Sequence, residues 1–368
     1  MAVGGYWQYA GATNPSRAYV FDLAGPTPTL PVATLTNSNP SYSDHFGVKI
    51  AMSGTRVVVP AMRDPTGATN AGAVYLYDLS SPTPGRPVLT LTNPSPAPED
   101  MFGNAVALSG NRLLVGCASD DTGAADAGIV YVYDLGGASP ALPVVTLTHP
   151  RPAAGNYFGA GAILTGTRAF VPARSDGAGG SAGGIVYAYD LASATPNVPS
   201  LVFTNPSPAA GDYFGSVASS GNYVVIGAFL DDTEVQDSGS VYVYDLSDAS
   251  PTVPVAMLSR PVRASQQTFG YRVAIHDTTI VVGAPWDGTL GQYHGAAYVF
   301  DLRPALSLVA SAPGLATLSW TPSNAPGFVL QYSDSVPPTN WVSAPSGAAN
   351  PVTIVTTNAA RFFRLAQP

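Results

Sequence analysis

The sequence predicts an all-β repeat protein, a β-propeller built from four-stranded blades. A pentapeptide of the form Tyr-(Val/Leu/Ala)-(Tyr/Phe)-Asp-Leu occurs six times, and its aspartates are 56, 56, 56, 55 and 56 positions apart, about the length of one blade. These aspartates are Asp22, Asp78, Asp134, Asp190, Asp245 and Asp301. The 38 glycines and 35 prolines, with only 10% charged residues, are typical of many short strands joined by turns.

Residues 102–149 show one repeat most clearly. Residues 104–108 alternate in the period of a half-buried strand, and a tight turn at 109–111 leads to an apolar strand at 112–117. An acidic loop, 119–127, precedes a third strand at 128–135, in which Tyr131 and Tyr133 share one face. The fourth strand is expected at 144–148, and Pro-rich connectors link the repeats.

Each full repeat opens on a Phe-Gly pair, and the last also contains Gly283-Ala284-Pro285. The pairs begin at Phe46, Phe102, Phe158, Phe214 and Phe269. The pattern resembles the FG-GAP repeat family, the unit of the integrin α-subunit propeller and of many bacterial surface proteins, over residues 1–303. We expect each Phe to pack between neighbouring blades while its Gly allows close backbone approach. The aspartate that ends the third strand is expected to accept backbone N–H bonds in a turn.

The chain begins inside a repeat. Gly4-Gly5-Tyr6-Trp7 aligns with residues 283–286, so the first copy lacks its Phe-Gly pair and first strand, and the last lacks a clear fourth strand. Four whole and two partial blades predict a six-bladed propeller, with a seventh blade upstream of Met1 as the alternative that would match the integrin count.

After residue 303 the repeat stops, and residues 304–368 are expected to form a small β-sandwich. Six strand-like runs occur there: 306–310, 315–320, 328–332, 341–344, 352–356 and 361–365. The segment is similar to fibronectin type III-like terminal modules of secreted bacterial proteins. The alternative is that residues 306–310 supply the fourth strand of the last blade.

Composition excludes several classes of partner. The net charge is −8 and Lys49 is the single lysine, which argues against nucleic-acid binding. The sequence contains no apolar run long enough to span a membrane, and residues 1–10 lack the features of a signal peptide.

The lone cysteine, Cys117, lies in an apolar run and is expected to be buried and structural.

Calcium is the metal that the acidic loops favour. The Asp-rich loop that holds calcium in integrin-type repeats is replaced here by short turns such as 109–111, so those sites are not carried over. Carboxylates gather instead between the second and third strands, where they form either a calcium site or a solvated acidic loop. The candidate ligands are Asp231, Asp232, Glu234 and Asp237 in one repeat and Asp120, Asp121 and Asp126 in another.

These features favour a secreted or cell-surface binding or adhesion module that presents propeller loops to a protein or polysaccharide. The candidate contact residues are the loop aromatics Trp7, Trp286 and Tyr293. A structural spacer or assembly subunit is the alternative. A polysaccharide-acting enzyme is a third hypothesis, with no catalytic residue assigned, because the sequence lacks nucleophile-elbow, metal-ligand and phosphate-loop motifs.

Overall fold

The protein is all-β. The computed structural model describes residues 1–366 except 6–15, 39–43, 178–182, 263, 290–293 and, beyond residue 303, positions 304, 313–314, 322–328, 335–337, 339, 347–350 and 356–360. The described residues form strands and turns, and none of them is helical.

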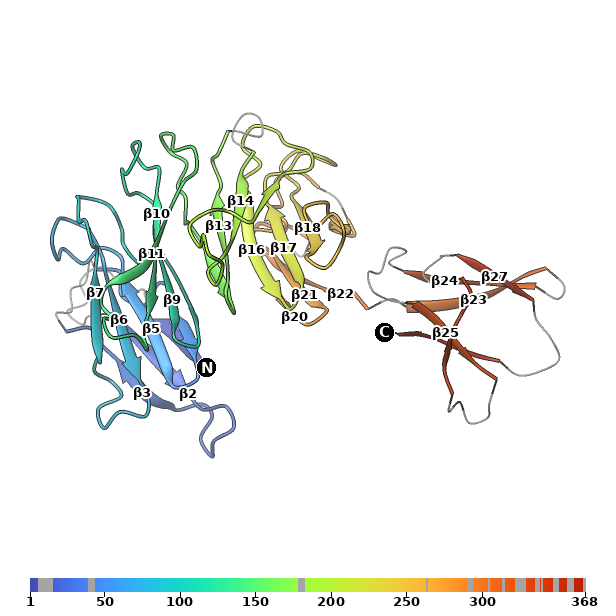
Figure 1. Ribbon diagram of the computed structural model, residues 1–368, viewed down its shortest axis with the longest axis horizontal. Coiled ribbons are helices and arrows are strands. Elements are labelled where there is room, and N and C mark those ends of the chain that lie inside the picture. Colours follow the sequence, from blue (N-terminus) through green and yellow to red (C-terminus); the bar gives the residue numbers. More distant parts are fainter. Residues whose placement is uncertain are drawn as a thin grey trace.

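Residues 2–301 form six antiparallel sheets that follow one another along the chain (Figure 1). Sheet 1 contains β1 (Ala2–Gly5), β2 (Arg17–Phe21) and β3 (Pro31–Leu35). Sheet 2 contains β4 (Ala51–Ser53), β5 (Arg56–Ala61), β6 (Ala73–Asp78) and β7 (Leu89–Thr92). Sheet 3 contains β8 (Ala105–Ser109), β9 (Arg112–Cys117), β10 (Ile129–Asp134) and β11 (Pro143–Thr148).

The second half repeats this plan. Sheet 4 contains β12 (Ile163–Thr165), β13 (Arg168–Ala173), β14 (Ile185–Asp190) and β15 (Leu201–Thr204). Sheet 5 contains β16 (Phe214–Ser220), β17 (Tyr223–Ala228), β18 (Ser240–Asp245) and β19 (Ala256–Leu258), and sheet 6 contains β20 (Arg272–His276), β21 (Thr279–Ala284) and β22 (Ala296–Asp301). Strands adjacent in sequence are adjacent in every sheet. This meander, with four strands in each of sheets 2–5 and three described strands in sheets 1 and 6, is consistent with a β-propeller.

Neighbouring sheets pack face to face through the phenylalanine of each Phe-Gly pair. Phe158 is fully buried among Leu114 and Val130 of sheet 3 and Tyr187 and Tyr189 of sheet 4. The expectation that this residue packs between sheets is therefore confirmed. A Cβ on the following glycine, Gly159, would lie 2.6 Å from a methyl carbon of Val130, so the glycine is needed for this approach.

The repeated Tyr-x-Tyr-Asp segment ends each third strand as predicted. The second tyrosine is fully buried in sheets 2–5, as Tyr77, Tyr133, Tyr189 and Tyr244. The following aspartate accepts a backbone N–H from two residues further along in each of the six sheets, for example Gly136 N to Asp134 Oδ1 at 3.0 Å. These carboxylates stabilise the turn between the third and fourth strands.

One residue from the same repeat position in each of sheets 2–6 lines a common cavity of about 200 Å³, here called the central cavity. These residues, each three positions after the phenylalanine, are Lys49, Ala105, Gly161, Val217 and Arg272. A cavity shared by the inner ends of five consecutive sheets is the arrangement that a propeller produces around its axis.

In sheets 2–5, a second glycine just before the third strand has a role that sequence inspection missed. Gly128 has φ +83°, and a Cβ there would lie 2.3 Å from the backbone oxygen of Phe158 in the next repeat. Gly72, Gly184 and Gly239 meet the same backbone atom of Phe102, Phe214 and Phe269. In sheets 2–5 the glycine before the third strand thus packs directly against the next Phe-Gly pair.

We expect Gly128→Ala to lower the free energy of unfolding by about 3 kcal/mol, because the added methyl meets backbone and the φ angle is unfavourable. Gly110→Ala is the control, since Gly110 also has positive φ (+57°) but open space around its Cβ position. Its cost should stay near 1 kcal/mol. Urea denaturation of both variants checks this, and equal costs would contradict the packing argument.

The residues after 303 form two further three-stranded sheets. One contains β23 (Ala305–Ala312), β24 (Leu315–Thr321) and β27 (Val352–Val355), and the other contains β25 (Val329–Ser333), β26 (Val342–Ser343) and β28 (Phe362–Ala366). Leu318 and Trp320 of the first pack against Leu330 of the second. Each of the six predicted runs therefore contains a strand. The alternative role for residues 306–310 is wrong, because β23 pairs with β24 and not with β22.

Candidate ligand-binding cleft between sheets 5 and 6

A cleft of about 690 Å³ opens between the loops of sheets 5 and 6. Its described lining residues are Leu230, Asp237, Gln266, Thr268, Pro285 and Trp286. We call it the inter-sheet cleft. Its size lies within the range of sites for small organic ligands.

Trp286 lies two residues after the end of β21 and is 56% exposed, an unusual degree for so large an apolar side chain. The cleft also presents a carboxylate from Asp237 and an amide from Gln266, and Thr268 forms part of its wall. The Thr268 hydroxyl is buried and has no hydrogen-bond partner among the described residues. An aromatic face beside such polar groups can bind a flat apolar surface edged with hydroxyls or amides.

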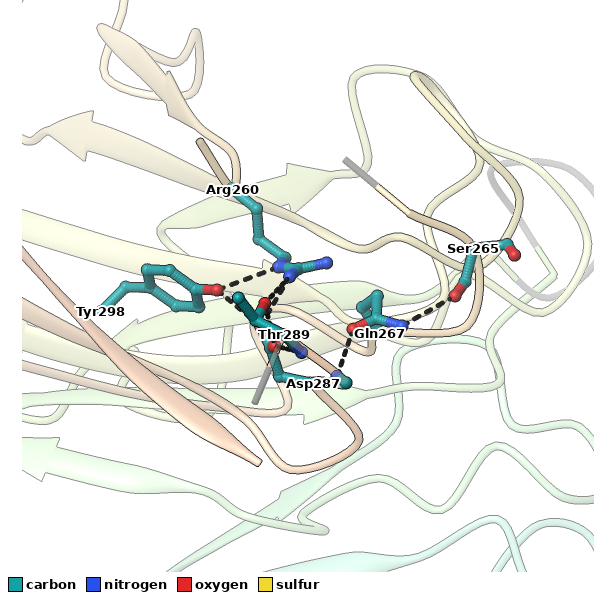
Figure 2. Close-up of polar contacts among 7 residues, drawn as sticks. Arg260, Ser265, Gln267, Asp287, Thr289 and Tyr298 are labelled. Atoms are coloured by element: carbon teal, nitrogen blue, oxygen red, sulfur yellow. Dashed lines mark hydrogen bonds and ion pairs between the residues drawn. The ribbon is translucent and has the colours of Figure 1, made fainter. Parts of the chain in front are cut away.

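A polar network, buried at Arg260 and Asp287, joins residues that adjoin the cleft lining in sequence (Figure 2). Arg260 pairs with Asp287 at 2.7 Å and also donates to Thr289 Oγ1 at 3.0 Å and Tyr298 Oη at 3.2 Å. Gln267 Oε1 accepts the N–H of Gly288 at 2.8 Å. Since Gln267 lies between two lining residues and Asp287 follows Trp286, the network positions both walls.

Asp287 is ionised and paired in this network. Burial by itself raises the pKa of this carboxyl, but hydrogen bonds from Thr289 and Tyr298 and the nearby Arg260 charge outweigh burial and hold the pKa below its usual value. Arg260 and Asp287 are each at most 5% exposed, so their pair is shielded from solvent.

The repeat positions of Arg260, Gln267 and Asp287 carry polar side chains in every full repeat, and we call each set of three a polar cluster. Sheets 2, 3 and 5 combine an asparagine with two buried aspartates: Asn37, Asp44 and Asp64; Asn93, Asp100 and Asp120; Asn205, Asp212 and Asp231. Sheet 4 has His149, Asn156 and Asp176, and sheet 6 has Arg260, Gln267 and Asp287. Wherever a basic side chain replaces the asparagine, an amide replaces the first aspartate. The charge of Arg260 is thus matched by a single carboxylate, Asp287, whereas the clusters of sheets 2, 3 and 5 keep two carboxylates and no cation.

In sheet 3, Cys117 adds its sulfur to this cluster. The ligand atoms of Asp100, Cys117 and Asp120 all lie within 4.8 Å of one another and are buried. The thiol donates to the backbone oxygen of Asp100 at 3.2 Å, and burial raises its pKa. Cys117 is therefore buried as predicted and is a poor nucleophile.

Among the cluster carboxyls, Asp212 has the most strongly raised pKa. It is 1% exposed, and its Oδ2 accepts bonds from Asn205 and Ala209, both at 2.7 Å, while Oδ1 has no partner among the described residues. Burial, with a further contribution from Asp231, raises the pKa of Asp212 to about 6. The folded protein therefore binds a proton near pH 5 that the unfolded chain does not.

Asp212→Asn should change the pH dependence of stability. The raised pKa means that wild-type stability falls as pH rises from about 4 to 6. The amide, which Asn156 already provides at this position in sheet 4, avoids the buried charge. We expect the variant to gain about 2 kcal/mol over the wild type at pH 8 and little at pH 4. Urea denaturation at both pH values tests this, with Ser207→Ala as a control, and a gain equal at the two pH values would be inconsistent with it.

The predicted acidic loop residues are not equivalent to one another. Asp231 and Asp120 are buried, not solvated, and Asp231 is bonded through Oδ2 to Tyr242 Oη and through Oδ1 to Thr233 N. Asp232 and Asp121 each accept the backbone N–H five residues further along, from Asp237 and Asp126. Among the described residues, neither loop brings three carboxylates together as ligands.

Of the predicted aromatic contacts, Trp286 lies in the cleft, whereas Trp7 and Tyr293 fall outside the described residues. Sequence inspection missed Gln266, Thr268 and the supporting Arg260. Aligning the repeats gives a signal for Arg260, because it stands where three other repeats have asparagine.

Comparison with known families supports the repeat assignment. The FG-GAP repeat model matches residues 31–77, 88–133, 203–244 and 255–300. The chain is an FG-GAP repeat protein. No curated protein matches it.

Each FG-GAP match is offset from the sheets by one strand. The match at 88–133, for example, begins at the last strand of sheet 2 and ends in the third strand of sheet 3. One FG-GAP repeat therefore contains strands of two sheets. In the match at 88–133, the polar cluster of Asn93, Asp100 and Asp120 belongs to the same repeat. FG-GAP repeats build β-propellers that often serve in binding or adhesion, and they are typical of extracellular proteins. None of the described residues belongs to a helix that could cross a membrane.

Proposed function

We propose that this FG-GAP repeat protein is a non-catalytic binding module that holds a polysaccharide in the inter-sheet cleft. The observation that carries the proposal is the exposed Trp286 indole beside the polar groups of Asp237 and Gln266. Sugar rings present an apolar face edged with hydroxyl groups, and this lining complements both.

The rigid support beneath the cleft favours binding. Trp286 and Gln266 adjoin residues fixed by the Arg260–Asp287 pair and the Gln267–Gly288 bond, so little backbone entropy is lost when a ligand binds. The described lining includes one carboxylate, Asp237, whereas hydrolysis of a glycoside commonly uses two. Both features favour recognition over catalysis.

The proposal includes the wider architecture. Sheets 1–6 would be six propeller blades within a domain of residues 1–303, and residues 304–368 would be a fibronectin type III-like β-sandwich that acts as a spacer or attachment module. The protein would act outside the cell or at the cell surface. Support comes from the meander topology, the shared central cavity and the FG-GAP matches.

A glycan and polysaccharide array tests the function. We expect the wild-type chain to bind at least one class of polysaccharide, and Trp286→Ala to weaken binding about tenfold or more. Tyr157→Ala is the matched control, since Tyr157 is an exposed loop aromatic of sheet 4. Binding that Trp286→Ala leaves intact would refute the cleft assignment. If the wild-type chain binds no ligand on the array, a protein partner or a structural role is favoured.

Running the array with calcium and with chelator also tests the proposed calcium sites. Asp231 and Asp120 are buried, whereas Asp232 is exposed and Glu234 is half-buried, so Asp232 and Glu234 are better targets for mutation. If loop 231–237 binds calcium, Asp232→Asn with Glu234→Gln should abolish any calcium-dependent binding or rise in melting temperature. A calcium response that this variant retains would remove the loop as its source.

A further inference from the structure

Basic side chains gather in the central cavity of a protein whose net charge is −8. Lys49, Arg174 and Arg272 all line this cavity of about 200 Å³. Lys49 and Arg272 occupy the same repeat position in sheets 2 and 6, while Arg174 comes from the turn after β13 in sheet 4. Three separate repeats therefore direct positive charge to one place.

The repeat sequence makes room for Arg174. Gly161 stands at the position taken by Lys49 and Arg272 in their own repeats, and a Cβ there would lie 2.9 Å from the Arg174 guanidinium. Arg174 Nε donates to the backbone oxygen of Gly215 in the next repeat at 3.3 Å. This bond fixes the side chain across the junction of sheets 4 and 5.

The three cations lie close enough to disfavour one another's charge. Burial, followed by the charges of Arg272 and Arg174, lowers the pKa of Lys49. Burial likewise lowers the pKa of Arg174 to about 10, and Arg272 adds to the effect. Among the described residues, no carboxylate forms an ion pair with any of the three. Such clustering of like charge is unfavourable unless an anion offsets it.

We propose that the central cavity binds a small oxyanion with two negative charges, held by Lys49, Arg174 and Arg272. Guanidinium groups match the geometry of sulfate, phosphate and carboxylate oxygens, and the Lys49 ammonium supplies a further donor. The cavity volume is below the range for drug-sized ligands, which favours a small ion over a sugar chain. Arg272 is exposed, so the site is open to solvent. This site is separate from the inter-sheet cleft.

Isothermal titration of the full chain with sodium sulfate and with sodium malonate, at constant ionic strength, tests the proposal. We expect saturable binding of one or both anions, and the two arms distinguish a tetrahedral from a carboxylate ligand. Arg272→Gln and Arg174→Gln should each weaken binding about tenfold or more. Arg168→Gln is the matched control, because it removes a positive charge from exposed Arg168 on the same strand that leads to Arg174.

Arg272→Gln decides the outcome if Arg174→Gln fails to fold, since Arg272 is exposed and its guanidinium contacts only its neighbour Tyr271 among the described residues. The absence of saturable binding for both anions would overturn the proposal. Equal affinities for Arg272→Gln and Arg168→Gln would also overturn it, because the anion would then respond to net charge alone.

Discussion

Arg260→Asn should lower the free energy of unfolding by about 3–5 kcal/mol, because it leaves the buried Asp287 carboxylate without its cation. The substitution also removes donors to Thr289 and Tyr298. Urea denaturation at pH 7 measures the loss. The inter-sheet cleft should be disturbed as well, since this network positions the backbone beside Trp286.

A second variant separates charge balance from simple loss of packing. Arg260→Asn combined with Gln267→Asp recreates the Asn-Asp-Asp cluster of sheets 2, 3 and 5. We expect this pair to recover part of the loss at pH 5, where the two carboxylates can share a proton. If the double variant is less stable than Arg260→Asn at pH 5, the clusters are not interchangeable and the charge-balance account is wrong.

Phe158→Ala should cost about 3–5 kcal/mol, since it removes a fully buried ring at the junction of sheets 3 and 4. The ring makes edge contacts with His149 at 5.6 Å and Tyr189 at 6.4 Å between centroids, which the alanine forfeits. Thermal and urea unfolding both report the loss.

Tyr157→Ala is the neighbouring control, and its exposed side chain should cost under about 1 kcal/mol. Phe158→Leu should be intermediate, because leucine refills part of the cavity. If Phe158→Ala lowers the free energy of unfolding as little as Tyr157→Ala does, the phenylalanine of the Phe-Gly pair does not stabilise the packing between sheets.

The sequence predicted the parts of the fold that repeat. The Phe-Gly pairs, the third-strand tyrosines and the turn aspartates recur at one spacing, so a single physical role explains all copies of each. The glycine before the third strand was missed although it also recurs, because its partner is backbone of the next repeat, and such contacts leave no side-chain pattern.

The sites depend on what differs between repeats. Lys49 and Arg272 share a repeat position but Arg174 does not, so only the folded chain shows that they line one cavity. Asp231 was expected in a solvated or metal-binding loop, yet it is buried against Tyr242, because carboxylates in that loop point both inward and outward. Trp286 was identified as an aromatic residue in a predicted loop, whereas no sequence pattern indicated Thr268.

The most direct test of the account is the ¹⁵N–¹H spectrum of the indole groups during titration with oligosaccharides prepared from the strongest array ligand. The chain has four tryptophans, and Trp286→Phe assigns the signal of interest. The account predicts that the Trp286 signal shifts with saturation while that of Trp320, buried in the C-terminal sheets, stays constant. Binding that leaves the Trp286 signal unmoved would contradict it.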